Sequence, residues 1–218
     1  MSPEGASGIL LVLSSPTGGG KTTIARRLVA RDGAIRFSVS HTTRSPRPGE
    51  REGEDYHFVS PEAFRTMVER GEFLEWAEVH GHRYGTHRRE RPAAASEGKD
   101  LILDIDVQGG LQVRKAERDA LLVFILPPSL QVLLERLAKR EGEPGFDLAG
   151  RLETAVKELE MAGSYDYNIV NEDLGKAVDQ VQCILDSARM CSMRLSKQAQ
   201  ALRGEIVQWL RSRDVHRQ

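Results

Sequence analysis

The sequence predicts an α/β fold with a parallel sheet core flanked by helices. Three largely apolar runs carry this prediction, at residues 9–13, 101–106 and 121–126. Each run has the continuous apolar pattern of a strand that is buried on both faces. A glycine-rich turn and a helical pattern at 22–28 follow the first run. Strand, turn and helix in this order form the opening unit of an α/β domain.

The first run is followed by a sequence that is suited to hold phosphate groups. Residues 14–23 read SSPTGGGKTT, which matches the second half of the P-loop pattern, with Ser15 at the position of its first glycine. Small residues let backbone N–H groups point at phosphate oxygens, and the following helix N-terminus adds positive partial charge. Lys21 can then reach the β and γ phosphates, and the hydroxyl of Thr22 can bind Mg²⁺.

Residues 37–84 differ from the flanking sequence and predict a small β-rich insertion. Short alternating pieces lie at 37–40, 56–59 and 73–79, with turn residues at 45–49 between the first two. Within this segment Arg44 and Arg47 lie three positions apart around a proline. Two guanidinium groups on a stiff loop suit a phosphate monoester, although solvated loop charge is the alternative.

The parallel-strand pattern returns at 101–106 and ends in acidic residues. Asp104 follows an apolar run, as in a Walker B strand, so we expect it to lie near a bound Mg²⁺ ion and to contact it through water. The run at 121–126 is ended by Pro127 and Pro128, and Ser129 can cap a helix that passes through Leu137. A loop at 141–150, a helix at 152–162 and a strand at 167–170 complete the predicted domain.

The C-terminal part is predicted to be one long helix, because apolar or small residues recur at steps of three and four from Val178 to Trp209. The first half of this stripe is expected to pack on the core of the chain itself. The second half, from about Leu195, is longer than a compact domain needs. It could pack on the same chain or meet another subunit in a homo-oligomer.

Several bulk properties limit the partners of the protein. The chain has 218 residues and a net charge of -1, so no global field draws it to nucleic acid or to an anionic membrane. The early apolar run is too short to span a bilayer and lacks the basic start of a secretory signal, so we expect a cytoplasmic location. Cys183 and Cys191 lie roughly 12 Å apart along one helix, too far for a disulfide, and are expected to be half-buried thiols.

Several motifs together resemble those of guanylate kinases. They lie at 37–44, 55–56, 71–76, 84–86 and 102–109, and the resemblance extends from residue 9 to about residue 186. It implies a P-loop kinase fold with a core at 1–36 and 94–186, a GMP-binding insertion at 37–93, a lid at 136–151 and a C-terminal helical extension at 187–218. The implied activity is Mg²⁺-dependent transfer of the ATP γ-phosphoryl group to GMP or dGMP.

The resemblance also implies roles for individual residues. The residues implied to bind ATP are Ser15, Pro16, Thr17, Gly18, Gly19, Gly20, Lys21, Thr22, Thr23 and Asn171, the last near the adenine. The residues implied to bind GMP are Ser40, Arg44, Arg47, Tyr56, Glu75, Tyr84, Thr86 and Asp106. The residues implied to act in catalysis are Lys21, Arg44 and three lid arginines, Arg136, Arg140 and Arg151, whereas Thr22 and Asp104 are implied to hold the metal.

The chemistry of Glu75 supports its implied role. Guanine presents two adjacent donors, N1–H and the N2 amino group, and a carboxylate has two acceptor oxygens. Adenine has an acceptor at N1, so the same carboxylate would face a lone pair, and a buried polar mismatch costs roughly 1–3 kcal/mol. The predicted loop at 141–150 departs from the lid sequence that the family resemblance suggests.

Three other classes of function are possible: a non-catalytic module, a different kinase and a nucleic-acid-binding protein. A scaffold module of the same fold would bind phosphopeptides without catalysis, but it would be expected to lose residues such as Lys21 and Thr22. A sugar-phosphate kinase would keep the phosphate loop without needing Glu75, and an adenylate kinase would carry a helical AMP site. Nucleic-acid binding by the basic C-terminal helix is the third, and a solvated helix face explains its charges more simply.

Overall fold

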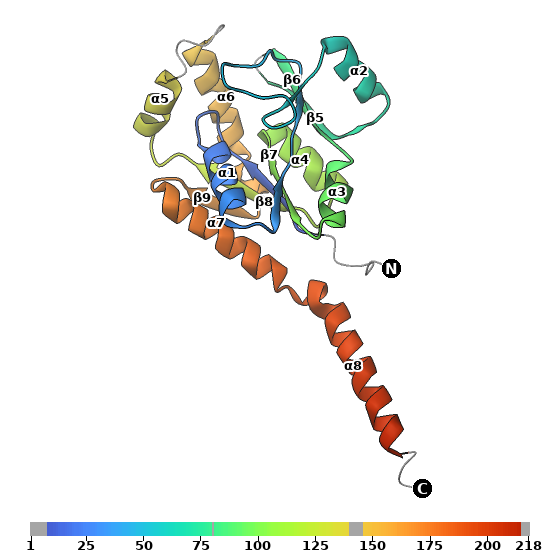
Figure 1. Ribbon diagram of the computed structural model, residues 1–218. Helices are drawn as coiled ribbons and strands as arrows, with labels where there is room; N and C mark the ends of the chain where they lie inside the picture. Colours follow the sequence, from blue (N-terminus) through green and yellow to red (C-terminus); the bar gives the residue numbers. More distant parts are fainter. Residues whose placement is uncertain (1–7, 80, 140–145, 215–218) are drawn as a thin grey trace.

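The computed structural model describes residues 8–79, 81–139 and 146–214, and Figure 1 shows their arrangement. Arg140 and the first half of the predicted loop at 141–150 therefore lie outside the described residues. The chain forms a parallel sheet with helices on both faces, a smaller sheet beside one end of it, and a terminal helix that extends away from both (Figure 1). The predicted α/β fold is confirmed.

The main sheet has five parallel strands in the order β2-β7-β1-β8-β9. The strands are β1 (Leu10–Ser14), β2 (Ile35–Phe37), β7 (Asp100–Asp104), β8 (Leu121–Leu126) and β9 (Tyr167–Val170). The centre of the sheet is β1, which pairs with β7 so that Leu13 lies opposite Asp104. Because parallel strands end at the same edge, this register brings Asp104 next to the turn that follows β1.

Helices cover both faces of this sheet because β1 is apolar at every position but the last. Leu11 and Leu13 pack against α1 (Lys21–Arg31) and α7 (Leu174–Arg189) on one face. Leu10 and Val12 pack on the other face, with α3 (Glu90–Ser96) and α4 (Val107–Ala116). The helices α5 (Leu130–Ala138) and α6 (Leu148–Glu160) share a smaller apolar cluster, and a 3₁₀ turn at Ala162–Ser164 leads into β9. Ser129 caps α5 by accepting a hydrogen bond from the N–H of Val132, as predicted.

The smaller sheet has the order β4-β3-β6-β5 and forms the insertion. Its strands are β3 (His41–Thr42), β4 (His57–Phe58), β5 (Phe73–Val79) and β6 (His82–His87). The insertion also contains a helix, α2 (Pro61–Glu69), which the sequence analysis did not predict. Its signals were present, because Ser60 caps it through the N–H of Ala63 and Pro61 begins it. Phe64 of α2 is buried and stacks on Phe73, with ring centroids 4.5 Å apart.

Several sequence predictions differ from the structure. The predicted strand at 37–40 is wrong, because Phe37 ends β2 and pairs with Ile102 of the main sheet. The C-terminal part is two helices, α7 and α8 (Ser192–Asp214), which are separated at Met190 and Cys191. The apolar stripe continues across this break, so the periodicity of the sequence did not indicate that one helix ends and another begins there. Cys183 and Cys191 are unpaired, as expected, but they are exposed and not half-buried.

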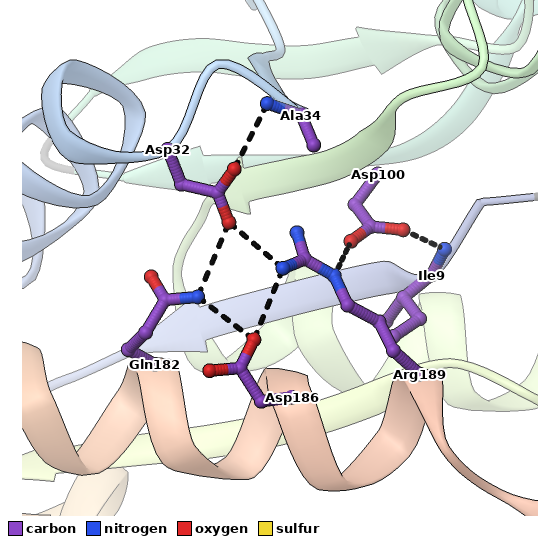
Figure 2. Close-up of polar contacts among 7 residues, drawn as sticks. All are labelled: Ile9, Asp32, Ala34, Asp100, Gln182, Asp186 and Arg189. Atoms are coloured by element: carbon purple, nitrogen blue, oxygen red, sulfur yellow. Dashed lines mark hydrogen bonds and ion pairs between the residues drawn. The ribbon is translucent and has the colours of Figure 1, made fainter.

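A polar network holds the end of α7 against the main sheet, as Figure 2 shows. Arg189 donates to Asp100 and Asp32 at 2.8 Å each, and to Asp186 at 3.0 Å. Asp100 in turn accepts a hydrogen bond from the N–H of Ile9 at 2.6 Å. The last turn of α7 is therefore fixed to the start of the central strands, at the edge opposite the glycine-rich turn. Among the described residues, no helix is both long and apolar enough to cross a bilayer.

Candidate active site

The turn between β1 and α1 is an open cradle of backbone amides. Gly18 and Gly20 have φ angles of 88° and 92°, which other residues rarely adopt. Gly20 precedes α1 and brings no side chain to cap this helix, so its first N–H groups are available to an anion. Ser15 is buried and donates its hydroxyl hydrogen to the carbonyl of Pro16 at 2.9 Å. The serine at the first glycine position therefore has a partner inside the loop.

Lys21, Thr22 and Asp104 converge at the open side of this cradle. The ammonium of Lys21 lies 3.5 Å from Oδ1 of Asp104, and the hydroxyl of Thr22 donates to Oδ2 of the same carboxylate. Oδ1 of Asp104 is buried and accepts no hydrogen bond from the described residues. A hydroxyl and a carboxylate with spare acceptor capacity are oxygen ligands of the kind that Mg²⁺ takes, together with water and phosphate oxygens. These residues therefore fit a Mg²⁺ ion.

Arg136 and Asn171 support the back of the cradle. Arg136 of α5 donates to the carbonyl of Gly19 and to the carbonyl of Asn171, both at 3.0 Å. The side-chain amide of Asn171, which is buried, donates to the same Gly19 carbonyl at 3.0 Å. The cradle, α5 and the segment after β9 are thus joined by three hydrogen bonds, two of which end at the carbonyl of Gly19. The structure places Arg136 in contact with the phosphate loop, which its position in the sequence alone did not indicate.

The insertion contributes a cationic cluster that faces the cradle. Arg44 forms a two-pronged ion pair with Glu50, at 2.9 Å and 2.8 Å, and its guanidinium lies 5.4 Å from the ring centroid of Tyr56. Glu50 also accepts from the backbone N–H of Arg47 at 2.7 Å. The rings of Tyr56 and Tyr84 meet edge to face at 5.9 Å. Burial raises the pKa of Tyr56 to about 12, so its hydroxyl remains a hydrogen-bond donor at neutral pH.

Glu75 is a buried carboxylate in the same cleft. It lies on β5 opposite Thr86 of β6, and Oε1 accepts from the N–H of Thr86 at 2.9 Å. Only 3% of Glu75 is exposed, and the hydroxyl of Thr86 is buried without a hydrogen-bond partner in the described part of the chain. A Cβ atom on Gly109 would lie 2.4 Å from Oε2 of Glu75, so the glycine makes room for this carboxylate. The pocket therefore holds polar groups with hydrogen-bonding capacity to spare for a ligand.

The environment of Glu75 makes its ionisation unfavourable. Burial, with a smaller contribution from the negative charge of Asp106, raises the pKa of Glu75 to about 7. Asp106 begins α4, where its side chain accepts from the N–H of Gly109 at 2.9 Å, and burial raises its pKa as well. Strongly perturbed carboxyl groups in a cleft are typical of binding or catalytic sites.

The sequence analysis missed one titratable group near the cradle. Glu158 of α6 accepts a hydrogen bond from the N–H of Thr17 at 3.2 Å. Burial raises the pKa of Glu158 to about 7. No sequence signal distinguishes Glu158 from the other charges of α6, because only the packing of α6 brings it to the loop. On the same helix Arg151 is buried, and its guanidinium lies 5.0 Å from the ring centroid of Phe146.

The predicted site residues lie around one cleft of about 1280 Å³. It is lined by residues of the cradle, by Arg44, Arg47, Tyr56, Glu75 and Tyr84 of the insertion, and by Asp104, Asp106, Arg136, Arg151 and Asn171. Ser40 lines it as well, whereas Pro16, Gly19 and Thr86 do not, and Arg140 is outside the described residues. A phosphate cradle on a parallel sheet, with a second cationic cluster across one cleft, defines a P-loop nucleotide-binding protein with two anion sites.

Comparison with known proteins gives the family. The guanylate kinase family model matches residues 7–188, which ends before α8. The chain is 46% identical to a guanylate kinase of Cupriavidus metallidurans over 84% of this chain and 85% of that protein. It is 44% identical to a guanylate kinase of Thermotoga maritima over 93% of this chain and 98% of that protein. A crystal structure of guanylate kinase from Anaplasma phagocytophilum has a TM-score of 0.71 at 36% identity, and covers 86% of this chain and 89% of that one. The chain belongs to the guanylate kinase family.

Proposed function

We propose that the protein transfers the γ-phosphoryl group of ATP to GMP and releases ADP and GDP. The observation that carries this proposal is the buried carboxylate of Glu75, held in the same cleft as a phosphate cradle. A cradle alone would fit many ATP-using proteins. A desolvated acceptor pair with the buried threonine hydroxyl beside it suits a base with two neighbouring donors, which is guanine.

The ATP site follows from the cradle. The amides of the loop and of the first turn of α1 surround the β and γ phosphates, and the ammonium of Lys21 adds a positive charge. Asn171 lies beside Gly20, where it can border the adenine. The residues assigned to this site are Ser15, Pro16, Thr17, Gly18, Gly19, Gly20, Lys21, Thr22, Thr23 and Asn171.

The GMP site lies in the insertion. Arg44, Arg47, Tyr56 and Tyr84 hold the phosphate, because guanidinium forks and phenol hydroxyls donate to its oxygens. Glu50 occupies the fork of Arg44, so the phosphate of GMP has to compete with this carboxylate. Glu75 faces the guanine with Ser40 near it, Thr86 supports Glu75 through its N–H, and Asp106 lies beside Glu75. The acceptor can be GMP or dGMP.

The reaction needs positioning and positive charge more than it needs a base. An oxygen of the GMP phosphate attacks the γ-phosphorus, a new P–O bond forms, and the bond to the bridging oxygen of ADP breaks. The attacking oxygen is already ionised, so no group has to remove a proton from it. Lys21, Arg44 and the lid arginines Arg136, Arg140 and Arg151 stabilise charge on the transferring group, and such an arginine is worth about 10³–10⁵ in rate.

Mg²⁺ is the cofactor that this site fits. Thr22 and Asp104 would hold it, Asp104 through water. When bound, the ion neutralises charge on the phosphate oxygens.

The chain divides by this proposal into a core at 1–36 and 94–186, which contains a lid at 136–151, a GMP-binding insertion at 37–93, and a helical extension at 187–218. We propose that insertion and lid close over the two nucleotides and exclude water, which would otherwise hydrolyse ATP. Two exposed, unpaired cysteines are consistent with work in the reducing cytoplasm, and no nucleic acid or membrane is proposed as a partner.

A coupled ADP-release assay with ATP and Mg²⁺ tests this function, with GMP, dGMP, AMP, UMP and CMP offered in parallel. The expected result is turnover with GMP, with or without dGMP, and background rates with the other nucleotides. Equal turnover with AMP would contradict the role of Glu75. Turnover with none of the five would support the scaffold or sugar-phosphate alternatives.

A further inference from the structure

The terminal helix α8 presents an exposed apolar face in its second half. Figure 1 shows α8 extending away from the body, roughly continuing the direction of α7. From Ala199 to Leu210 every residue is exposed except the half-buried Val207. Leu202, Ile206 and Leu210 are 58%, 50% and 51% exposed, and their spacing of four places them on one face of the helix. Helices in water owe most of their stability to packing of an amphipathic face, so this face calls for a partner.

A matching surface lies on the body of the same protein. A groove of about 900 Å³ runs between β9 and α7 and is lined by Tyr167, Val170, Gln180, Cys183 and Ile184, among others. In the described part of the main sheet, β9 is an edge strand. Tyr167 and Val170 are 45% and 51% exposed there. Exposed edge strands with apolar residues are usually covered, because they can pair with other chains.

We propose that α8 of one copy docks in the β9–α7 groove of a second copy, and that the exchange is reciprocal about a two-fold axis near Met190 and Cys191. Reciprocal exchange is the simplest arrangement, because a two-fold axis gives each subunit the same surface and closes the assembly at a dimer. The proposed dimer does not depend on the proposed phosphoryl transfer.

The lengths of the two helices agree with this arrangement. At about 1.5 Å per residue, Leu202 and Ile206 lie roughly 17 Å and 23 Å along α8 from Cys191. By the same measure Gln180 and Lys176 lie roughly 15 Å and 21 Å back along α7 from Met190. An antiparallel pair about the break therefore sets the apolar face of α8 opposite the groove face of the partner's α7.

The charges agree as well. Helix α8 carries Arg203, Arg211 and Arg213 in its second half, where Glu205 and Asp214 are the acidic residues. In the antiparallel arrangement the end of α8 lies near the start of α7, where Glu172 and Asp173 line the groove. The helix dipoles also favour this pairing, since the C-terminal end of α8 meets the N-terminal end of α7.

The structure favours a second copy over the helix of the same chain. Arg189 is bound to Asp32 and Asp100, which fixes the last turn of α7 on the sheet (Figure 2). Only Met190 and Cys191 connect α7 to α8, and α8 leaves in the direction of α7. To reach the groove of its own chain, α8 would have to reverse its direction within these two residues. It can reach the groove of a second copy in the direction that it already has.

Sedimentation velocity of the full chain over a range of concentrations tests the proposal. The wild type is expected to form a dimer. Ile206→Asp places a charge in the contact and should raise the dimer dissociation constant roughly 30-fold, the size of a hot-spot effect. Gln208→Asp is the matched control, because it adds the same charge on the opposite face of α8 and should leave the dimer intact. Gln180→Arg changes the groove without touching α8, and should weaken the dimer even if α8 tolerates no aspartate.

Labelling of Cys183 in the Cys191→Ser background gives a second measurement. Cys183 lines the groove and is exposed in the single chain, so dimerisation should slow its labelling, and Ile206→Asp should restore the fast rate. A protein that stays monomeric at all concentrations overturns the proposal. Slow labelling of Cys183 in such a monomer would indicate that α8 of the same chain covers the groove, and fast labelling would leave the groove open to another partner. A dimer that Ile206→Asp and Gln180→Arg leave intact overturns it too.

Discussion

Replacing Glu75 by glutamine should weaken GMP use while it stabilises the protein against alkaline pH. The change is nearly isosteric, and its Oε1 can still accept from the N–H of Thr86. The amide, however, turns two donor hydrogens toward a base that also presents donors. Hydrogen bonds to a charged group are worth about 1.5–3 kcal/mol each, so the loss of two should lower kcat/KM for GMP by roughly 10²–10⁴. The KM for ATP should stay within about threefold.

The effect of Glu75→Gln on stability is opposite to its effect on GMP use, and its size follows from the pKa of Glu75. The pKa of Glu75 is raised from 4.5 to about 7 in the folded protein, so the folded state binds its proton more tightly than the unfolded state. The stability that this provides is full below pH 4.5 and is lost as the pH rises through 7. One pKa unit corresponds to about 1.4 kcal/mol, so the wild type should lose about 3 kcal/mol between pH 4.5 and pH 8 relative to Glu75→Gln.

Urea unfolding of both proteins at several pH values measures this difference, because every other titrating group is common to the two. Nucleotide kinetics with GMP and ATP are measured on the same preparations. A variant that loses GMP activity and stability together would indicate simple damage to the fold. A pH-independent stability difference would refute the claim that Glu75 is a buried acid with a raised pKa.

Three further predictions concern the same cleft. The KM for GMP should rise up to about tenfold per pH unit as the pH falls below 7, because protonated Glu75 no longer presents two acceptors. If the KM for GMP of Glu75→Gln changed with pH at the same slope, the effect would come from the phosphate of GMP instead. Gly109→Ala should lower kcat/KM for GMP by about tenfold or more with little change in the KM for ATP, since its methyl group would displace the Glu75 carboxylate. Gly163→Ala is the control, because a Cβ atom at that position meets open space. Glu158→Gln should lower the KM for ATP by about threefold above pH 7 and have no effect below pH 6, because it removes a negative charge beside the cradle. Steady-state kinetics in which the ratio of the two KM values for ATP, variant to wild type, stays constant across this pH range would argue against that charge.

Much of the fold could be predicted from the sequence because its signals are local. Strand β8 and strand β9 were predicted with their observed bounds. Strand β8 is a continuous apolar run that is ended by two prolines, a pattern that is typical of a buried strand. The phosphate loop was predicted for the same reason, because its glycines, lysine and threonine are consecutive. The helix α2 was missed, although Ser60 and Pro61 are good start signals, because the surrounding alternation suggested strands.

The arrangement of the site depended on contacts between distant segments. The bonds of Arg136 and Asn171 to one carbonyl of the cradle join three parts of the chain. The nearness of Glu158 to Thr17 comes from the packing of α6, and no pattern in the helix itself distinguishes that position. The ion pair of Arg44 with Glu50 is local, yet the sequence analysis did not predict Glu50 as a partner of Arg44.

The sequence by itself determined four strands of the main sheet (β1, β7, β8 and β9), the phosphate loop, and the kind of side chains brought to the second site. Backbone preferences and apolar periodicity act over a few residues, so they can be read along the chain. Only the tertiary structure decided the burial of Glu75, the break between α7 and α8, and the groove beside β9. Burial, pKa and the direction of a helix depend on which distant segments exclude water from a group, and that is a property of the packed chain.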